Sequence, residues 1–285
     1  MALDQSKKWR KLLGVPARAD SMQVCKAFER LAVALAPRDL KGLPLYAMPI
    51  SALPPEFMLA SRFTGGWFHV LAYFWARPYL PDDRGPGPTF FVQDIRTEEN
   101  ARSLATAAQT VLTVGGEVVE IEELLEFVPP MNTESLCKTL VHELAHALES
   151  LADGDWQMWN EIAKIRSRKD PSLKRLDTTA NFDELLSRKQ KQTEEGPPRL
   201  DCHGLRFTRI ICHLDHRLRS VGIDGGDYSA AGECFEQRDY SDCCDALGSE
   251  LEECHRKSFA DILDSPPPPA FEKCSLNNCN EKAVA

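Results

Sequence analysis

Two histidines and a glutamate near the middle of the chain have the spacing of a metal site. They lie in His142-Glu143-Leu144-Ala145-His146, the pattern H-E-x-x-H. Residues four apart on a helix lie one turn above each other, so both imidazoles can reach one ion. Glu143 follows the first of them and can take the proton of a water that zinc has acidified. The pattern predicts a zinc-dependent hydrolase, foremost a metallopeptidase, with His142 and His146 as zinc ligands and Glu143 as general base.

The residues around this motif favour a helix that buries one face. Asn132 or Thr133 can cap a helix that runs to about Ser150. Its apolar residues follow the helical period, and they are Leu136, Leu140, Val141, Leu144 and Leu148. The alternative interpretation is an ordinary helix whose two histidines are surface or core residues.

An open zinc site needs a third protein ligand, and the sequence offers several candidates. A metzincin site is excluded, because Glu149 and Ala152 occupy the positions where that class needs Gly and His. Asp153 and Asp155 follow the motif closely, and a carboxylate of either can turn back toward it.

Two further candidates lie farther along the chain. Asn160-Glu161 is the kind of pair that thermolysin-like enzymes carry on their second helix, although Lys164 stands where that pattern has an aspartate. The other candidate is His203, which opens a new amphipathic pattern. At this point the residues leave the third ligand open between these carboxylates and His203.

The segment around His203 resembles part of a known family. Residues 202–214 read C-H-G-L-R-F-T-R-I-I-C-H-L, with His203-Gly204 followed by Phe207. Together with H-E-x-x-H, this is similar to the H-G-x-x-F/W segment of the SprT-like zincins. The resemblance covers about residues 131–150 and 201–220. The linker between the two stretches is longer than in that family, and the C-terminal cysteines lack the C-x-x-C pairs of the zinc ribbon found in many members.

The resemblance implies a fold, a metal and a substrate class. It implies an α+β, zincin-like metallopeptidase domain with a small β-sheet, one Zn²⁺, and His203 as the third zinc ligand. A protein or peptide would be the substrate, with Glu143 as the base. Two alternative functions remain: a DNA-associated protease, as some members are, and a non-catalytic interaction module that zinc only braces.

The rest of the sequence predicts the elements that must hold this site. Apolar spacing predicts helices over 8–13, 21–35, 98–109 and 201–222. Runs of β-branched and aromatic residues predict strands over 43–50, 67–75 and 89–95. The run VLTV-GG-EVVEI, residues 111–121, predicts a β-hairpin with a two-residue turn.

These elements divide into a metallopeptidase domain and a tail. The domain covers about 1–222, with a polar, basic insertion near 151–200, and residues 223–285 form an acidic, Cys-rich tail that we expect to be a loosely packed appendage. His213 and His216 are candidates for supporting the site, or are helix surface residues. The tail holds either buried thiols or a second, structural zinc site drawn from Cys234, Cys243, Cys244, Cys254, His255, Cys274 and Cys279.

Composition and charge limit the class of partner. The chain of 285 residues has a net charge of −9, so nucleic acid is not an expected partner. No apolar stretch of signal-peptide type follows the N-terminus, and no run is long enough to span a bilayer. We therefore expect a cytoplasmic protein without membrane contact. Its ten cysteines, eight of them after residue 200, are then expected as reduced thiols or metal ligands.

Overall fold

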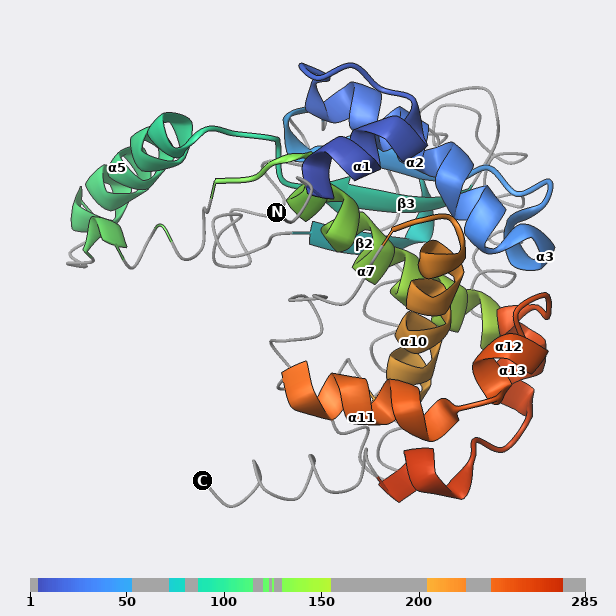
Figure 1. Ribbon diagram of the computed structural model, residues 1–285. Helices are drawn as coiled ribbons and strands as arrows, with labels where there is room; N and C mark the ends of the chain where they lie inside the picture. The colour runs from blue at the N-terminus through green and yellow to red at the C-terminus, as the bar shows by residue number, and fades with distance from the viewer. Residues whose placement is uncertain are drawn as a thin grey trace, which may run out of the picture.

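Part of the chain is described in detail by the structure, which is a computed structural model (Figure 1). The described residues are 5–52, 72–79, 87–114, 120–122, 125, 130–154, 204–223 and 237–273. The expected insertion lies almost entirely outside these residues. No helix within the described ranges is long and apolar enough to cross a membrane.

The chain begins with helices whose ends are set by local chemistry. They are α1 (Gln5–Leu13), α2 (Ser21–Leu35) and the single turn α3 (Pro37–Leu40). Asp20 caps α2 in a capping box, in which its side chain accepts from the Gln23 amide while the Gln23 side chain accepts from the Asp20 amide. Pro37 cannot continue α2, and it occupies the first turn of α3, where its missing N–H costs nothing.

A small mixed sheet follows the first helices. It comprises β1 (Tyr46–Pro49), β2 (Ala72–Tyr79) and β3 (Gly87–Val92), in the order β1-β3-β2. β1 pairs with β3 in parallel, and β2 pairs with β3 in the antiparallel direction. A short 3-10 turn, η1 (Ile50–Ala52), follows β1. Helices together with this sheet agree with the expected α+β class.

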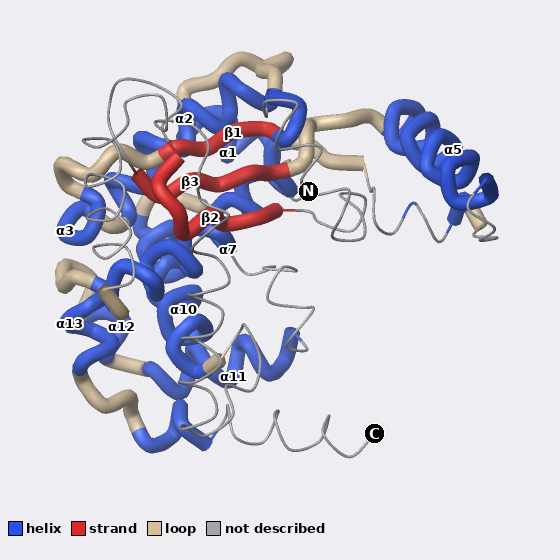
Figure 2. The backbone as a smooth tube through the Cα atoms, turned by 180° about the vertical axis from the view of Figure 1, so that it is seen from behind, coloured by secondary structure: helices blue, strands red, loops and turns tan. Residues whose placement is uncertain are grey.

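The helix that carries the H-E-x-x-H motif is the centre of the fold. It is α7 (Thr133–Ala152), which contacts β2, β3, α1, α2, α10 and α13. Figure 2 shows α7 between the sheet and α10. Its apolar stripe is fully buried, at Leu136, Leu140, Leu144 and Leu148. Burial of these apolar side chains therefore fixes the position of α7 more firmly than helix propensity would.

The predicted hairpin over 111–121 is wrong. Helix α5 (Glu98–Val114) continues through the first of its two strands. Figure 1 shows α5 projecting away from the sheet, so a hairpin here would not join β1, β2 or β3, the strands that the structure describes. A lone two-stranded hairpin is marginally stable in water, whereas β-branched residues cost a helix only a few tenths of a kcal/mol each, in the range of about 0.3–0.7 kcal/mol.

The C-terminal helices pack into the same core as α7. They are α10 (Leu205–Ser220), α11 (Gln237–Leu247), α12 (Glu250–Glu253) and α13 (Phe259–Asp264). The expectation of a loosely packed tail is therefore wrong for 237–273, where Phe259, Ile262 and Phe271 are fully buried in the main core. The charged and Cys-rich composition of this region suggested loose packing, although its apolar residues recur at helical spacing.

Arg217 of α10 ties this C-terminal part to the N-terminal helices. The guanidinium donates to the Leu35 carbonyl at 2.6 Å and to the Lys257 carbonyl at 3.0 Å. It also lies 4.3 Å from the centre of the Phe259 ring, a cation–π contact. One buried cation therefore joins the end of α2, the turn after α12 and the start of α13.

Candidate metal centre

Helix α7 places the two motif histidines on one face. Its N-cap is Asn132, whose side chain accepts a hydrogen bond from the Ser135 amide at 2.9 Å. Asn132 is one of the two cap residues that the sequence predicted. His142 lies well inside the uninterrupted helix, so the backbone around the motif is regular. His142 and His146 are consequently stacked one turn apart.

The two imidazoles have a spacing that suits one metal ion. Their ring centres are 5.0 Å apart, and the ring planes are inclined at 74°. Two imidazoles that bind one zinc ion through nitrogens at 2.0–2.1 Å, with a tetrahedral angle between them, have ring centres about 5 Å apart. Both histidines are only half-buried, so an ion can approach them. The pair therefore fits zinc in donor type and in spacing.

Glu143 differs from both histidines in its burial. Its side chain is 5% exposed, although it carries a carboxyl group. A carboxylate seldom tolerates this degree of burial without a partner or a function. Its place on α7, directly after the first histidine, is that of a residue beside the ion rather than on it.

Phe207 of α10 contacts both histidines. Its ring centre is 5.0 Å from that of His142 and 4.4 Å from that of His146, where the ring planes are tilted by only 34°. Phe207 itself is 1% exposed. The buried ring limits the rotation of both imidazoles.

The same contact places the start of α10 beside the motif. Gly204 is the N-cap of α10, and Phe207 lies in the first turn of that helix. His203, the expected third ligand, lies outside the described residues, so its side chain has no described position. Its neighbour in sequence, Gly204, begins the helix whose first turn contacts both imidazoles.

An ion pair fastens α7 to α10 beyond the motif. Arg206 Nη2 lies 2.6 Å from Asp153 Oδ1, and Arg206 Nε lies 4.0 Å from a Glu149 carboxylate oxygen. Glu149 and Asp153 lie on the same helical stripe as His142 and His146. Their partner Arg206 lies more than fifty positions farther along the chain, and the packing of α10 on α7 brings it to them.

The described carboxylates of α7 do not complete the metal site. Asp153 is seven residues past His146, about 10 Å along the helix axis, and Arg206 holds its carboxylate. Among the residues that the structure describes, no three His, Cys, Asp or Glu side chains come together as metal ligands. The other carboxylate candidates, Asp155 and Glu161, lie outside the described residues, as His203 does.

His213 belongs to a buried ion-pair network remote from the motif in the chain. Its Nε2 lies 2.8 Å from Glu250 Oε1, and the guanidinium of Arg209 binds both Glu250 oxygens at 2.8 Å. Burial lowers the pKa of His213, against the opposing effect of Glu250, which favours the neutral ring. The buried contact with Glu250 indicates that His213 has a structural role.

His216 also points to a neighbour in the C-terminal part. Its ring centre is 5.5 Å from that of His255, and its Nε2 lies 3.5 Å from Glu252. Of the candidate ligands for a second zinc site, only Cys243, Cys244, Cys254 and His255 lie in the described ranges, and no three donors gather there. Cys234, Cys274 and Cys279 lie outside them.

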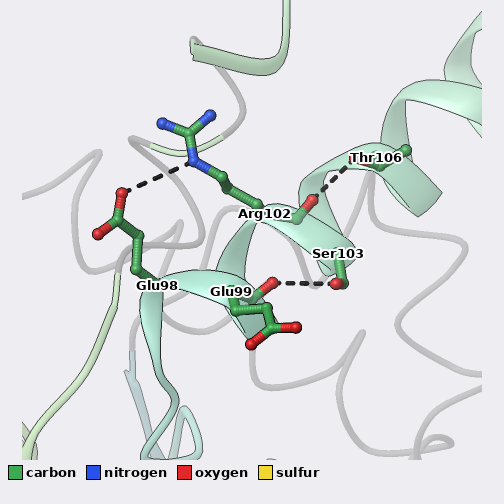
Figure 3. Close-up of a pocket in the computed structure, with 5 residues that line it drawn as sticks. All are labelled: Glu98, Glu99, Arg102, Ser103 and Thr106. Atoms are coloured by element: carbon green, nitrogen blue, oxygen red, sulfur yellow. Dashed lines mark hydrogen bonds and ion pairs between the residues drawn. The ribbon is translucent and has the colours of Figure 1, made fainter.

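A surface pocket on α5 is separate from the motif. Figure 3 shows its lining, which consists of Glu98, Glu99, Arg102, Ser103 and Thr106. The Arg102 guanidinium lies 3.7 Å from Glu98, and the two hydroxyls each donate to a carbonyl one turn earlier. These are ordinary contacts of a solvated helix face, and all five residues belong to the helix that projects from the sheet.

No protein-family model, curated protein or solved structure matches the chain. The SprT-like family therefore remains a resemblance carried by two short stretches of sequence. The candidate site rests on its own residues and their geometry.

Proposed function

We propose that this protein is a zinc-dependent hydrolase of peptide bonds, with His142 and His146 as zinc ligands and Glu143 as general base. The observation that carries the proposal is the pair of imidazoles on α7, whose ring centres are 5.0 Å apart. Glu143, which is buried and follows His142 directly in the chain, supplies the base that hydrolysis requires.

The chain's own residues take the positioning and proton-transfer roles. When bound, zinc supplies Lewis acidity, which acidifies water and polarises a carbonyl. Glu143 takes the proton of the attacking water and delivers it to the nitrogen of the leaving amine, so that it is ready for another turnover. Phe207 holds both imidazoles in place, because its buried ring lies against them.

His203 is our proposed third ligand. Its support is the closeness of the first turn of α10 to the motif, together with the engagement of Asp153 by Arg206. We also propose that the substrate is a protein or peptide, that nucleic acid is not a partner, and that the protein acts in the cytoplasm.

The test is a comparison of two Glu→Gln variants on one helix. Glu143→Gln should keep one equivalent of zinc and lower peptide or casein hydrolysis by about 10²–10⁴-fold, the usual contribution of a general base. Glu134→Gln is the matched control, because Glu134 pairs with Lys138 at the far end of α7. Normal hydrolysis by Glu143→Gln would remove Glu143 from the mechanism, and a wild-type protein that binds no zinc would remove the metal.

A second candidate function is a non-catalytic module braced by zinc. The contact of Phe207 with both imidazoles favours it, because a ring packed on two ligands suits a rigid structural site. The two functions differ in Glu143. In a structural site, Glu143→Gln leaves every measured property of the zinc-loaded protein unchanged apart from folding stability.

A further inference from the structure

Two cysteines from different helices lie close together in the C-terminal part. Cys212 of α10 and Cys244 of α11 have their sulfur atoms 3.1 Å apart, and both are free thiols. A disulfide bond is about 2.05 Å long, so the sulfurs need to approach by only about 1 Å to bond. Helices α10 and α11 pack on each other, and rotation of the side chains can supply this movement.

The two thiols have different surroundings. Cys212 is 1% exposed, whereas Cys244 is half-buried and can be reached from solvent. The hydrogen bond from Cys212 stabilises the thiolate of Cys244 and lowers its pKa, helped by Tyr240 and against the effect of burial. Burial and the neighbouring Cys244 raise the pKa of Cys212. Cys244 is therefore the nucleophile of the pair, because the thiolate is the reactive form.

We propose that Cys212 and Cys244 are a site of reversible disulfide formation, with a hydroperoxide as oxidant. The Cys244 thiolate attacks one oxygen of hydrogen peroxide, the O–O bond breaks, and hydroxide leaves to give a sulfenic acid. The Cys212 sulfur then attacks the Cys244 sulfur, the S–O bond breaks, and the hydroxide that leaves takes up the Cys212 proton to become water. In total two thiols lose two electrons and two protons, and the peroxide becomes two waters.

The bond would change how the C-terminal part is attached. α10 carries Phe207 at one end and Cys212 in its middle, and a disulfide there would tie α11 covalently to it. A cross-link between residues 212 and 244 also restricts the unfolded chain, which stabilises the folded protein. The modification requires neither zinc nor hydrolysis, so its test is independent of the proposed function.

The experiment follows each thiol in the full-length protein. Reduced protein is treated with hydrogen peroxide, denatured, alkylated with iodoacetamide and mapped as peptides without reduction. We expect one cross-linked pair that joins Cys212 to Cys244, two fewer alkylated cysteines, a raised Tm, and full reversal by dithiothreitol. The proposal is overturned if both thiols stay alkylatable while other cysteines oxidise, or if Cys244 pairs elsewhere.

Two variants assign the bond to these sulfurs. Cys244→Ser should leave Cys212 reduced and alkylatable after the same treatment. Cys243→Ser is the matched control, because Cys243 is the adjacent residue on α11, and here the Cys212–Cys244 peptide should still form. If the wild-type thiols react only after a chelator has been added, they bind a metal ion and the disulfide proposal is wrong. The wild-type mapping decides the matter even if a variant fails to fold.

Discussion

The ring of Phe207 lies 4.4 Å from the ring of His146, with only 34° between their planes. Sixty-one positions separate the two residues in the chain, yet the contact joins the first turn of α10 to the motif in the middle of α7. A buried, rigid ring against an imidazole fixes the direction of its nitrogens. The site is therefore held from two helices.

Phe207→Leu should weaken zinc binding. The leucine keeps the position apolar but leaves the His142 and His146 rings free to turn, and loss of a supporting group typically costs about 10–100-fold in metal affinity. The measurement is competition with a chromophoric chelator. Phe259→Leu is the control, because Phe259 is equally buried but contacts Arg217 instead. Equal losses of affinity in both variants would show that only general stability had changed.

His203→Ala and Asp153→Asn should separate the candidates for the third ligand. If His203 binds zinc, its removal lowers the affinity at least as much as His146→Ala does, because each variant removes one of three ligands. Asp153→Asn breaks an ion pair with Arg206 that is partly exposed, so zinc affinity should stay within a few-fold. Isothermal titration with zinc measures both variants. The reverse order of effects would make Asp153 the ligand.

Acid should weaken the attachment of α12 to α10. Burial would raise the pKa of Glu250, but the hydrogen bonds from His213 and Arg209 outweigh it and lower the pKa to about 2, from an ordinary 4.5. Burial also lowers the pKa of His213 from 6.5. For both groups the unfolded state binds more protons than the folded state. Their contribution to the free energy of unfolding is therefore fully present above about pH 6.5 and declines as the pH falls. The contribution of Glu250 is lost between pH 4.5 and 2.

Glu250→Gln tests this pH dependence. The variant leaves the Arg209 guanidinium buried without its carboxylate, and we expect about 3 kcal/mol less stability at pH 7. Urea unfolding at several pH values should also show a flatter dependence between pH 4.5 and 2, the range that Glu250 controls. Glu253→Gln is the matched control on the same short helix, since Glu253 is exposed. An unchanged slope in Glu250→Gln would contradict the network.

Arg217→Met should destabilise the whole fold. The change removes the donors to the Leu35 and Lys257 carbonyls and the contact with Phe259, at an expected cost of about 3 kcal/mol. Arg217→Lys should recover only part of this, because an ammonium lacks the planar fork of a guanidinium. Arg256→Met at an exposed position serves as control. Thermal unfolding followed by circular dichroism gives the comparison, and equal Tm values would exclude the proposed tie.

Local chemistry in the sequence determined the two most important helices. The bounds of α2 agree with the predicted 21–35, because Asp20 and Gln23 form a capping box and Pro37 stops the helix within a few residues. The position of His146 one turn after His142 on the same face also follows from the sequence, since a helix makes one turn in about four residues. These features depend on neighbours within one or two turns, and the sequence displays such neighbours directly.

Tertiary structure decided the features that depend on distant partners. The residues 111–114 do not themselves show whether a partner strand lies close to them. Their β-rich composition therefore predicted a strand, whereas α5 continues through them. The family resemblance singled out Phe207, but the packing of α10 on α7 decides its contact with both imidazoles. The engagement of Asp153 by Arg206, the burial of His213 with Glu250 and the approach of Cys212 to Cys244 had no signal in the sequence. Each joins residues more than thirty positions apart, and only the packing of α7, α10 and the C-terminal helices determines which of many similar side chains meet.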